Sequence, residues 1–171
     1  VSIATRPEHV AAILARQPEI MASGIISGQE LEPLLDKPTV LIVGPGLGRS
    51  PWSEQLLQKA VASGLPMVVD ADALNIIAEG RVVPNPDGSR WIMTPHSAEA
   101  ARLLNISVAE VQADRFSAVR ELQKKFNAVV LLKGAGTLIA SADNERVMVC
   151  PYGNPAMATA GMGDMLSGIV G

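Results

Sequence analysis

Short apolar runs alternate with amphipathic segments along most of this chain, and that alternation restricts its fold more than any other feature. Branched aliphatic side chains dominate the runs, which are predicted to be strands at residues 1–4, 39–43, 67–69, 91–93 and 128–132. Helices are predicted between them, at residues 7–15, 30–35, 51–63, 73–78, 97–104 and 107–126. Strands that alternate with helices predict a layered α/β sandwich with a mainly parallel sheet.

Local patterns refine the C-terminal half. Ser107 and Glu110 form a predicted capping box, from which one helix is expected to run to about Phe126. Residues 138–140 and 147–149 flank a turn and predict a β-hairpin. A glycine-rich loop then leads into the last predicted helix.

Residues 1–171 contain no internal repeat and no linker-like stretch, so a single domain is expected. The first apolar run starts without a preceding signal, and the closing MLSGIVG ends within an apolar helix without a cap. We therefore expect the domain to be truncated at both ends.

The composition excludes several classes of function. Hydrophobic residues make up 48% of the chain, charged residues 18% and aromatic residues 3%, which suits an aliphatic α/β core. A net charge of −3 gives no basic surface for nucleic acid or anionic lipid. No stretch approaches the roughly 20 apolar residues of a membrane span, and no secretory signal is present, so a cytoplasmic protein is expected. The single cysteine, Cys150, excludes an internal disulfide and is expected to be a small buried hydrophobe.

Every unusual motif in the sequence directly follows a predicted strand. Glycines follow residues 39–43, acids follow 67–69, a histidine follows 91–93 and a Lys-Gly pair follows 128–132. In open α/β sheets, ligands bind outside the carboxyl ends of the strands. The sequence therefore predicts a ligand site at this edge of the sheet.

The turn Gly161-Met162-Gly163-Asp164 opens the last predicted helix. Free N–H groups at a helix start can bind a phosphate or an oxyanion, and Asp164 can take a proton from a bound hydroxyl or water. Alternatively, Asp164 only complements the helix dipole. Asn154 and Thr159 are candidates to donate hydrogen bonds to a phosphate. Alternatively, each is a turn or N-cap residue.

Two further segments have the composition of phosphate-binding loops. Lys133-Gly134-Ala135-Gly136-Thr137 places a lysine at a strand end beside small residues, where it can reach a phosphate or be an ordinary surface lysine. Gly44-Pro45-Gly46-Leu47-Gly48 lacks the P-loop lysine and the full dinucleotide fingerprint, so alone it is a weak motif and is alternatively a tight turn between strand and helix.

Four polar residues complete the candidates. His96 and Glu99 either bind a polar substrate, or have structural roles as a lone histidine and a first-turn acid. Asp70 and Asp72 are candidates to hold a hydrated Mg²⁺, and Asp70 is alternatively a helix cap.

Five motifs, in the order GPGLG, DADALN, TPHSAE, LLKGAGT and GNPAMATAGMGDMLSG, resemble the ADP/ATP-dependent NAD(P)H-hydrate dehydratase family. The resemblance runs over essentially the whole chain. It implies a ribokinase-like three-layer sandwich, a homo-oligomer, and in some members fusion to an NAD(P)H-hydrate epimerase domain. Two positions depart from the family pattern: Ser97-Ala98 replaces a Pro-Gly, and Pro155 replaces a small residue.

The resemblance also implies a reaction. ADP or ATP, with Mg²⁺, phosphorylates the hydroxyl that hydration placed on C6 of the nicotinamide ring, and phosphate elimination restores NADH or NADPH. Asp164 is implied as the base, and no residue is implied as a metal ligand. The residues implied for ADP are Lys133, Gly134, Ala135, Gly136, Thr137, Asn154, Met157, Ala158, Thr159, Ala160, Gly161, Met162 and Gly163. Those implied for the hydrated nucleotide are Gly46, Thr94, Pro95, His96, Glu99 and Asp164.

The alternative is a ribokinase-like vitamin or sugar kinase with the same anion-binding turn, because a shared fold does not decide the substrate. Thiamine-pathway kinases of this superfamily usually carry Asn in place of His96, which favours the dehydratase. A third reading is a nucleotide-binding fragment without catalysis.

Overall fold

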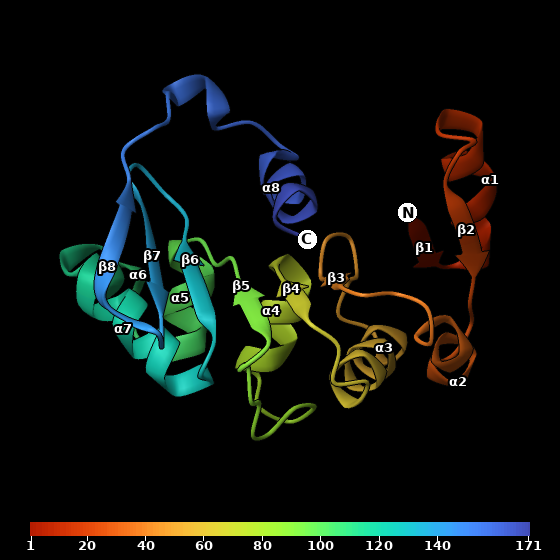
Figure 1. The fold of residues 1–171 in the computed structure, drawn as a ribbon, viewed down its shortest axis with the longest axis horizontal. Helices are drawn as coiled ribbons and strands as arrows, with labels where there is room; N and C mark the ends of the chain where they lie inside the picture. The colour runs from red at the N-terminus through yellow and green to blue at the C-terminus, as the bar shows by residue number, and fades with distance from the viewer.

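A six-stranded sheet forms the centre of the computed structural model, which describes residues 1–171 (Figure 1). The strand order is β3-β4-β5-β6-β7-β8, with parallel pairing from β3 to β6 and antiparallel pairing from β6 to β8. The strands are β3 (Leu41–Val43), β4 (Met67–Val69), β5 (Trp91–Met93), β6 (Val129–Leu132), β7 (Thr137–Ser141) and β8 (Asn144–Cys150). The predicted mainly parallel α/β sheet and the hairpin are confirmed.

The first 24 residues form a separate parallel pair of strands. β1 (Ser2–Thr5) and α1 (Pro7–Arg16) were predicted, whereas β2 (Met21–Gly24) was not, because its sequence MASG has no apolar alternation. Arg6 links this unit to α3, since its guanidinium lies over the Trp52 ring, 4.6 Å from the centroid. The short α2 (Gly28–Leu31) and the 3₁₀ turn η1 (Glu32–Leu34) follow near the predicted helix at 30–35.

Helices cover one face of the sheet and form the main core with it. These are α3 (Pro51–Ala62), α4 (Ala71–Ala78), α5 (Ser97–Leu104) and α7 (Arg115–Phe126). Alternate strand residues, such as Met67, Val69 and Met93, face these helices and are fully buried with Leu57 and Leu74. Since residues two apart on a strand share a face, this alternation orients the sheet.

The opposite face of the sheet carries α8 (Met162–Val170), which contacts β4 and follows an arched connection from β8 (Figure 1). A side chain on Gly171 would meet Ile42 at 2.9 Å, so the end of α8 lies against this face. Ile42 itself is 45% exposed. The apolar run at residues 39–43, which predicts a buried strand, forms a strand only at Leu41–Val43 and is partly exposed, because β3 is an edge strand of the sheet.

The helix predicted from Ser107 to Phe126 is divided in two at Asp114. α6 (Val108–Ala113) begins with the predicted capping box of Ser107 and Glu110. Asp114 then leaves helical geometry at φ −144° and ψ 84°, and its carboxylate accepts the backbone N–H of Ser117 at 2.9 Å. An acid that caps the following helix competes with helix continuation, and this break makes Arg115 the first residue of α7.

Cys150 is half-buried rather than buried, since β8 is the other edge strand of the sheet. No helix has the length and apolar character needed to cross a membrane.

Candidate functional site

Asp70 lies at the centre of a polar cluster where the parallel strands end. It directly follows β4 and is 1% exposed. Its Oδ1 accepts from Lys133 Nζ at 2.7 Å, and its Oδ2 accepts from Ser167 Oγ at 2.9 Å. Asp70 occupies the N-cap position of α4 but makes no side-chain cap bond. Its carboxylate instead ties β4 to the end of β6 and to α8.

The environment of Asp70 favours its ionised form. Burial of the carboxyl opposes ionisation, but the Lys133 ammonium and the hydroxyls of Thr94 and Ser167 outweigh it and lower the pKa of Asp70. A buried carboxylate is stable only when paired and hydrogen-bonded, and Asp70 meets both conditions.

Glu99 and His96 lie beside this ion pair and form a capping box, in which each side chain accepts a backbone N–H of the other residue. Glu99 is 5% exposed, and its Oε2 lies 4.0 Å from Lys133 Nζ and accepts the His96 N–H at 2.8 Å. In return, His96 Nδ1 accepts the backbone N–H groups of Ala98 and Glu99, at 3.1 and 3.2 Å. His96 is thus a helix cap on a half-exposed side chain, and its Nε2 lies 3.4 Å from Glu99 Oε1.

Thr94 and Pro95 hold the end of β5 in place. The Thr94 hydroxyl is fully buried and reaches the Val69 carbonyl at 3.5 Å. The Pro95 carbonyl accepts the Lys133 N–H at 2.8 Å, which fixes the start of the loop after β6. Both residues set the spacing between neighbouring strand ends.

The glycine turn after β3 packs against the backbone of Asp70. Gly44 has φ +127°, and a Cβ there would lie 1.7 Å from the Asp70 carbonyl oxygen. Gly46 has φ +63° and open space around it, and the N–H of Gly48 donates to Asp72 Oδ2 at 2.9 Å. Asp72 therefore stabilises this turn through its carboxylate.

The turn before α8 meets the same cluster. Gly161 has φ +86° and forms the N-cap of α8. A Cβ on Gly163 would lie 3.5 Å from Lys133 Nζ and 3.7 Å from Asp70 Oδ2, and the Gly163 carbonyl accepts from Ser167 Oγ at 3.1 Å. Asp164 is exposed in the first turn of α8, one residue beyond this contact.

The loop that precedes α8 is exposed along its length. Asn154 caps the 3₁₀ turn η2 (Pro155–Met157), since its side chain accepts the Ala156 N–H at 2.9 Å. The turn role proposed for Asn154 is therefore present. The remaining predicted residues, Met157, Ala158, Thr159 and Ala160, lie in this loop and make no side-chain hydrogen bond with Lys133–Thr137.

Two residues of the cluster carried no signal in the sequence analysis. Ser167 is fully buried and bonds both Asp70 and Gly163, yet it reads as an ordinary small helix residue. Arg115 donates from Nη1 to Ala135 O at 2.8 Å and from Nη2 to Leu132 O at 3.2 Å, which the predicted continuous helix obscured. A helix break recognised at Asp114 would have drawn attention to Arg115.

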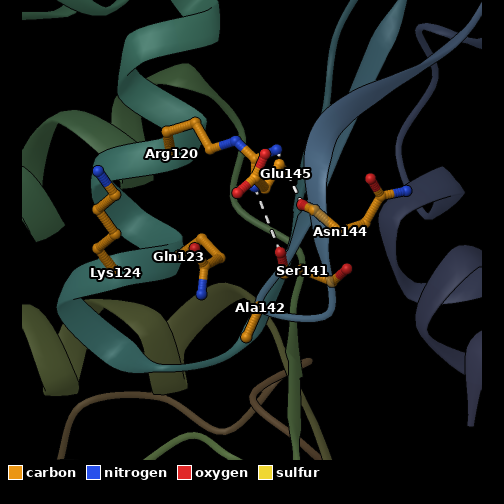
Figure 2. A pocket seen from close by; sticks show the side chains of 7 residues that line it. All are labelled: Arg120, Gln123, Lys124, Ser141, Ala142, Asn144 and Glu145. Atoms are coloured by element: carbon orange, nitrogen blue, oxygen red, sulfur yellow. Dashed lines mark hydrogen bonds between the residues drawn. The ribbon is translucent and has the colours of Figure 1, made fainter.

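A polar depression lies elsewhere, between α7 and the turn of the β7–β8 hairpin (Figure 2). Its lining includes Arg120, Lys124 and Glu145 and contains one hydrophobic residue. None of the predicted site residues lines it. The candidate site is therefore the strand-end cluster.

Solved structures define the class of protein. A ribokinase-like superfamily protein from Enterococcus faecalis superposes with a TM-score of 0.83 at 26% identity, over 99% of this chain and 58% of that chain. An ADP/ATP-dependent NAD(P)H-hydrate dehydratase from Bacillus subtilis, co-crystallised with ATP and Mg²⁺, gives 0.79 at 26% identity, over 99% of this chain and 59% of that chain. The fold is ribokinase-like, as the resemblance implied.

The family follows from sequence. The family model described as NAD(P)H-hydrate dehydratase matches residues 1–171. The bifunctional NAD(P)H-hydrate repair enzyme Nnr of Coxiella burnetii is 50% identical over 100% of this chain and 34% of its own length. The ADP-dependent (S)-NAD(P)H-hydrate dehydratase of Neisseria meningitidis is 42% identical over 94% of this chain and 54% of its own length. The chain belongs to the NAD(P)H-hydrate dehydratase family, and it spans about a third of the bifunctional relative.

Proposed function

We propose that this chain carries the ADP-dependent dehydration of C6-hydrated NADH and NADPH, a metabolite-repair reaction. The observation that supports this most directly is the proximity of Gly163 to the Lys133–Asp70 pair, since a Cβ on Gly163 would touch both side chains. It joins the glycine turn before α8 to the loop after β6, the two segments that a nucleotide diphosphate would need together. Family membership over residues 1–171 supports the same reaction.

Asp164 is the catalytic residue in this proposal. It takes the proton of the C6 hydroxyl while that oxygen attacks the terminal phosphoryl group of ADP, and AMP leaves. Loss of inorganic phosphate from C6 and of a proton from C5 then restores the ring double bond. The N–H groups of Gly161, Met162 and Gly163, at the start of α8, would stabilise the charge on the transferring phosphoryl group.

The loop segments divide between the two substrates. Lys133 to Thr137, with Asn154 and the segment from Met157 to Gly163, would bind ADP. Gly46, Thr94, Pro95, His96 and Glu99 would bind the hydrated nucleotide beside Asp164. The open surroundings of Gly46 and the half-exposed side chain of His96 are consistent with that second role.

Mg²⁺ fits this cluster as an ion that arrives with the nucleotide and neutralises phosphate charge. The chain gathers no group of three or more His, Cys, Asp or Glu residues that could hold a metal ion. Such a site suits Mg²⁺, which keeps several waters and needs only one or two carboxylates beside the phosphates. Asp70 and Glu99 would act through those waters, because their oxygens already bind Lys133, Ser167 and His96.

We further propose a domain fusion, an oligomeric state and a cellular location for this chain. The Coxiella burnetii relative is named as a bifunctional repair enzyme, which supports fusion of this chain to an epimerase domain. We also propose a homo-oligomer in the cytoplasm. Light scattering after size-exclusion chromatography of the full chain would test the oligomer, and a monomer would contradict it.

The activity is tested with the full chain, hydrated NADH, ADP and Mg²⁺. We expect recovery of the dihydronicotinamide absorbance together with equal release of AMP and inorganic phosphate. No recovery, together with ATP-dependent phosphorylation of a sugar or of hydroxymethylpyrimidine, would replace the dehydratase with the kinase alternative.

A further inference from the structure

Arg115 supports the loop after β6 from beneath. As the first residue of α7, it directs its guanidinium at the loop and donates to the carbonyls of Ala135, at 2.8 Å, and Leu132, at 3.2 Å. The loop backbone packs directly on this group, because a Cβ on Gly134 would lie 2.8 Å from Arg115 Nη2. Arg115 thus fixes the position of the loop relative to α7 and the direction of its carbonyl groups.

In the loop after β6, carbonyl groups accept hydrogen bonds whereas the backbone N–H groups of residues 134–136 make none. Two of its carbonyls are occupied, since Arg115 donates to that of Ala135 and Thr137 Oγ1 donates to that of Gly134 at 3.3 Å, while Arg115 also binds the Leu132 carbonyl at the end of β6. The N–H groups of Gly134, Ala135 and Gly136 donate to no acceptor within the protein. Successive unpaired N–H groups in a turn are the arrangement that binds anions in proteins.

The placement of Arg115 is unfavourable for a purely structural side chain. A cation at a helix N-terminus is repelled by the helix dipole, and the N-cap carboxylate of Asp114 accepts from the backbone N–H and hydroxyl of Ser117 and makes no ion pair with Arg115. Its Nε is buried without a partner, and no carboxylate lies within ion-pair distance of the guanidinium. The guanidinium therefore has no ion-pair partner and lies against the loop that carries the three unpaired N–H groups.

We propose that Arg115 is a positioning residue for the nucleotide. It holds the loop carbonyls away from the ligand, so that the N–H groups of residues 134–136 meet the diphosphate, and its charge strengthens their attraction for that anion. This inference rests on the proposed function, which gives the loop to ADP. It also explains why residue 134 is glycine, since a side chain there would displace the guanidinium.

Arg120 offers a matched control on the same helix. Its guanidinium also donates to two backbone carbonyls, those of Ser141 at 3.3 Å and Asn144 at 2.9 Å, at the hairpin turn (Figure 2). Substitution of either arginine removes the same kind of bonds. Only Arg115 contacts the loop that is proposed to bind ADP.

The experiment compares Arg115→Ala and Arg120→Ala in the full chain. Calorimetry would measure the Kd for ADP, steady-state kinetics the KM for hydrated NADH, and thermal melting the stability. We expect Arg115→Ala to weaken ADP binding by about tenfold or more, as for a lost charge-assisted contact, with little change in the KM for hydrated NADH. Arg120→Ala should leave both constants within about twofold at a similar melting temperature.

A conservative variant keeps the test independent of folding. Arg115→Lys retains the charge but has no planar fork to bind both carbonyls, so ADP affinity should fall to a value between those of the wild type and Arg115→Ala. Equal ADP affinity in Arg115→Lys, Arg115→Ala and Arg120→Ala would overturn the inference while leaving the proposed function in place. A wild-type chain that binds no ADP would overturn the proposed function itself, and the inference with it.

Discussion

Lys133 Nζ lies 2.7 Å from Asp70 Oδ1, although 63 residues separate them in the sequence. The pair spans β5, because Asp70 follows β4 and Lys133 follows β6. The side chains of Asp70 and Lys133 are 2% and 21% exposed, and a Cβ on Gly163 would touch both. One ion pair therefore links the core of the sheet to the start of α8, and its removal should affect stability as well as the site.

Asp70→Asn should be strongly destabilising. It leaves the Lys133 ammonium without its partner, at a cost of about 2–4 kcal/mol, slightly below that of a fully buried pair because Lys133 is 21% exposed. Urea denaturation of the full chain measures the loss. Glu32→Gln, which breaks the exposed pair with Lys59, should cost less than about 1 kcal/mol, and equal losses in the two variants would contradict a special role for Asp70.

The contribution of Asp70 should disappear in acid. Its pKa is lowered from the ordinary value of 3.8 on folding, so the native state favours the carboxylate. The stabilisation is therefore fully present above that value and is lost as pH falls through the lower native pKa. The difference in unfolding free energy between wild type and Asp70→Asn should be constant from about pH 7 to 5 and shrink below about pH 4. A difference that grew in acid would show the opposite sign.

Gly44→Ala and Gly46→Ala should differ sharply although both sit in one turn. A Cβ on Gly44 would overlap the Asp70 carbonyl at 1.7 Å, so the backbone must move, and we expect a loss of at least about 3 kcal/mol. Gly46 has open space and φ +63°, so only the left-handed conformation is penalised, by about 1–2 kcal/mol. Denaturation midpoints measure both, and similar losses would contradict the close approach of Gly44 to Asp70.

Two alanine substitutions in α8 separate stability from activity. Gly168→Ala meets no atom within 4 Å and should stabilise the helix by up to about 1 kcal/mol with unchanged turnover. Gly163→Ala is also sterically tolerated, since its Cβ would lie 3.5 Å from Lys133 Nζ, but it adds a methyl group to the proposed phosphate turn. We expect Gly163→Ala to remain folded and to lose at least about tenfold in kcat/KM. Full activity in Gly163→Ala would place the phosphoryl group elsewhere.

The elements with the clearest sequence signals were predicted accurately. Residues 67–69 and 91–93 are short apolar runs followed at once by polar motifs, and both are strands at the predicted positions. β2 was not predicted because it lacks apolar alternation. The break before α7 was not predicted because the Asp114 carboxylate caps α7 by accepting the Ser117 N–H, and helix periodicity does not reveal such a bond. Local pattern was sufficient only where it agreed with tertiary packing.

The candidate site was predicted in outline but not in its internal bonding. The rule that strand ends meet at one edge of a sheet predicted that Asp70, His96 and Lys133 lie together. It did not indicate that Lys133 pairs with Asp70, or that Ser167, 97 residues away from Asp70, completes the network. Such partners are fixed by side-chain packing after the sheet has formed, so no local motif marks them.

The central claim is that Asp164 activates the hydroxyl of the hydrated nicotinamide. The most direct measurement compares wild type with Asp164→Asn in the full chain, following turnover of hydrated NADH with ADP and Mg²⁺ alongside calorimetric binding of ADP. We predict that kcat falls by about 10²–10⁴-fold, as for loss of a general base, while the Kd for ADP changes little. Wild-type turnover in Asp164→Asn would contradict the claim.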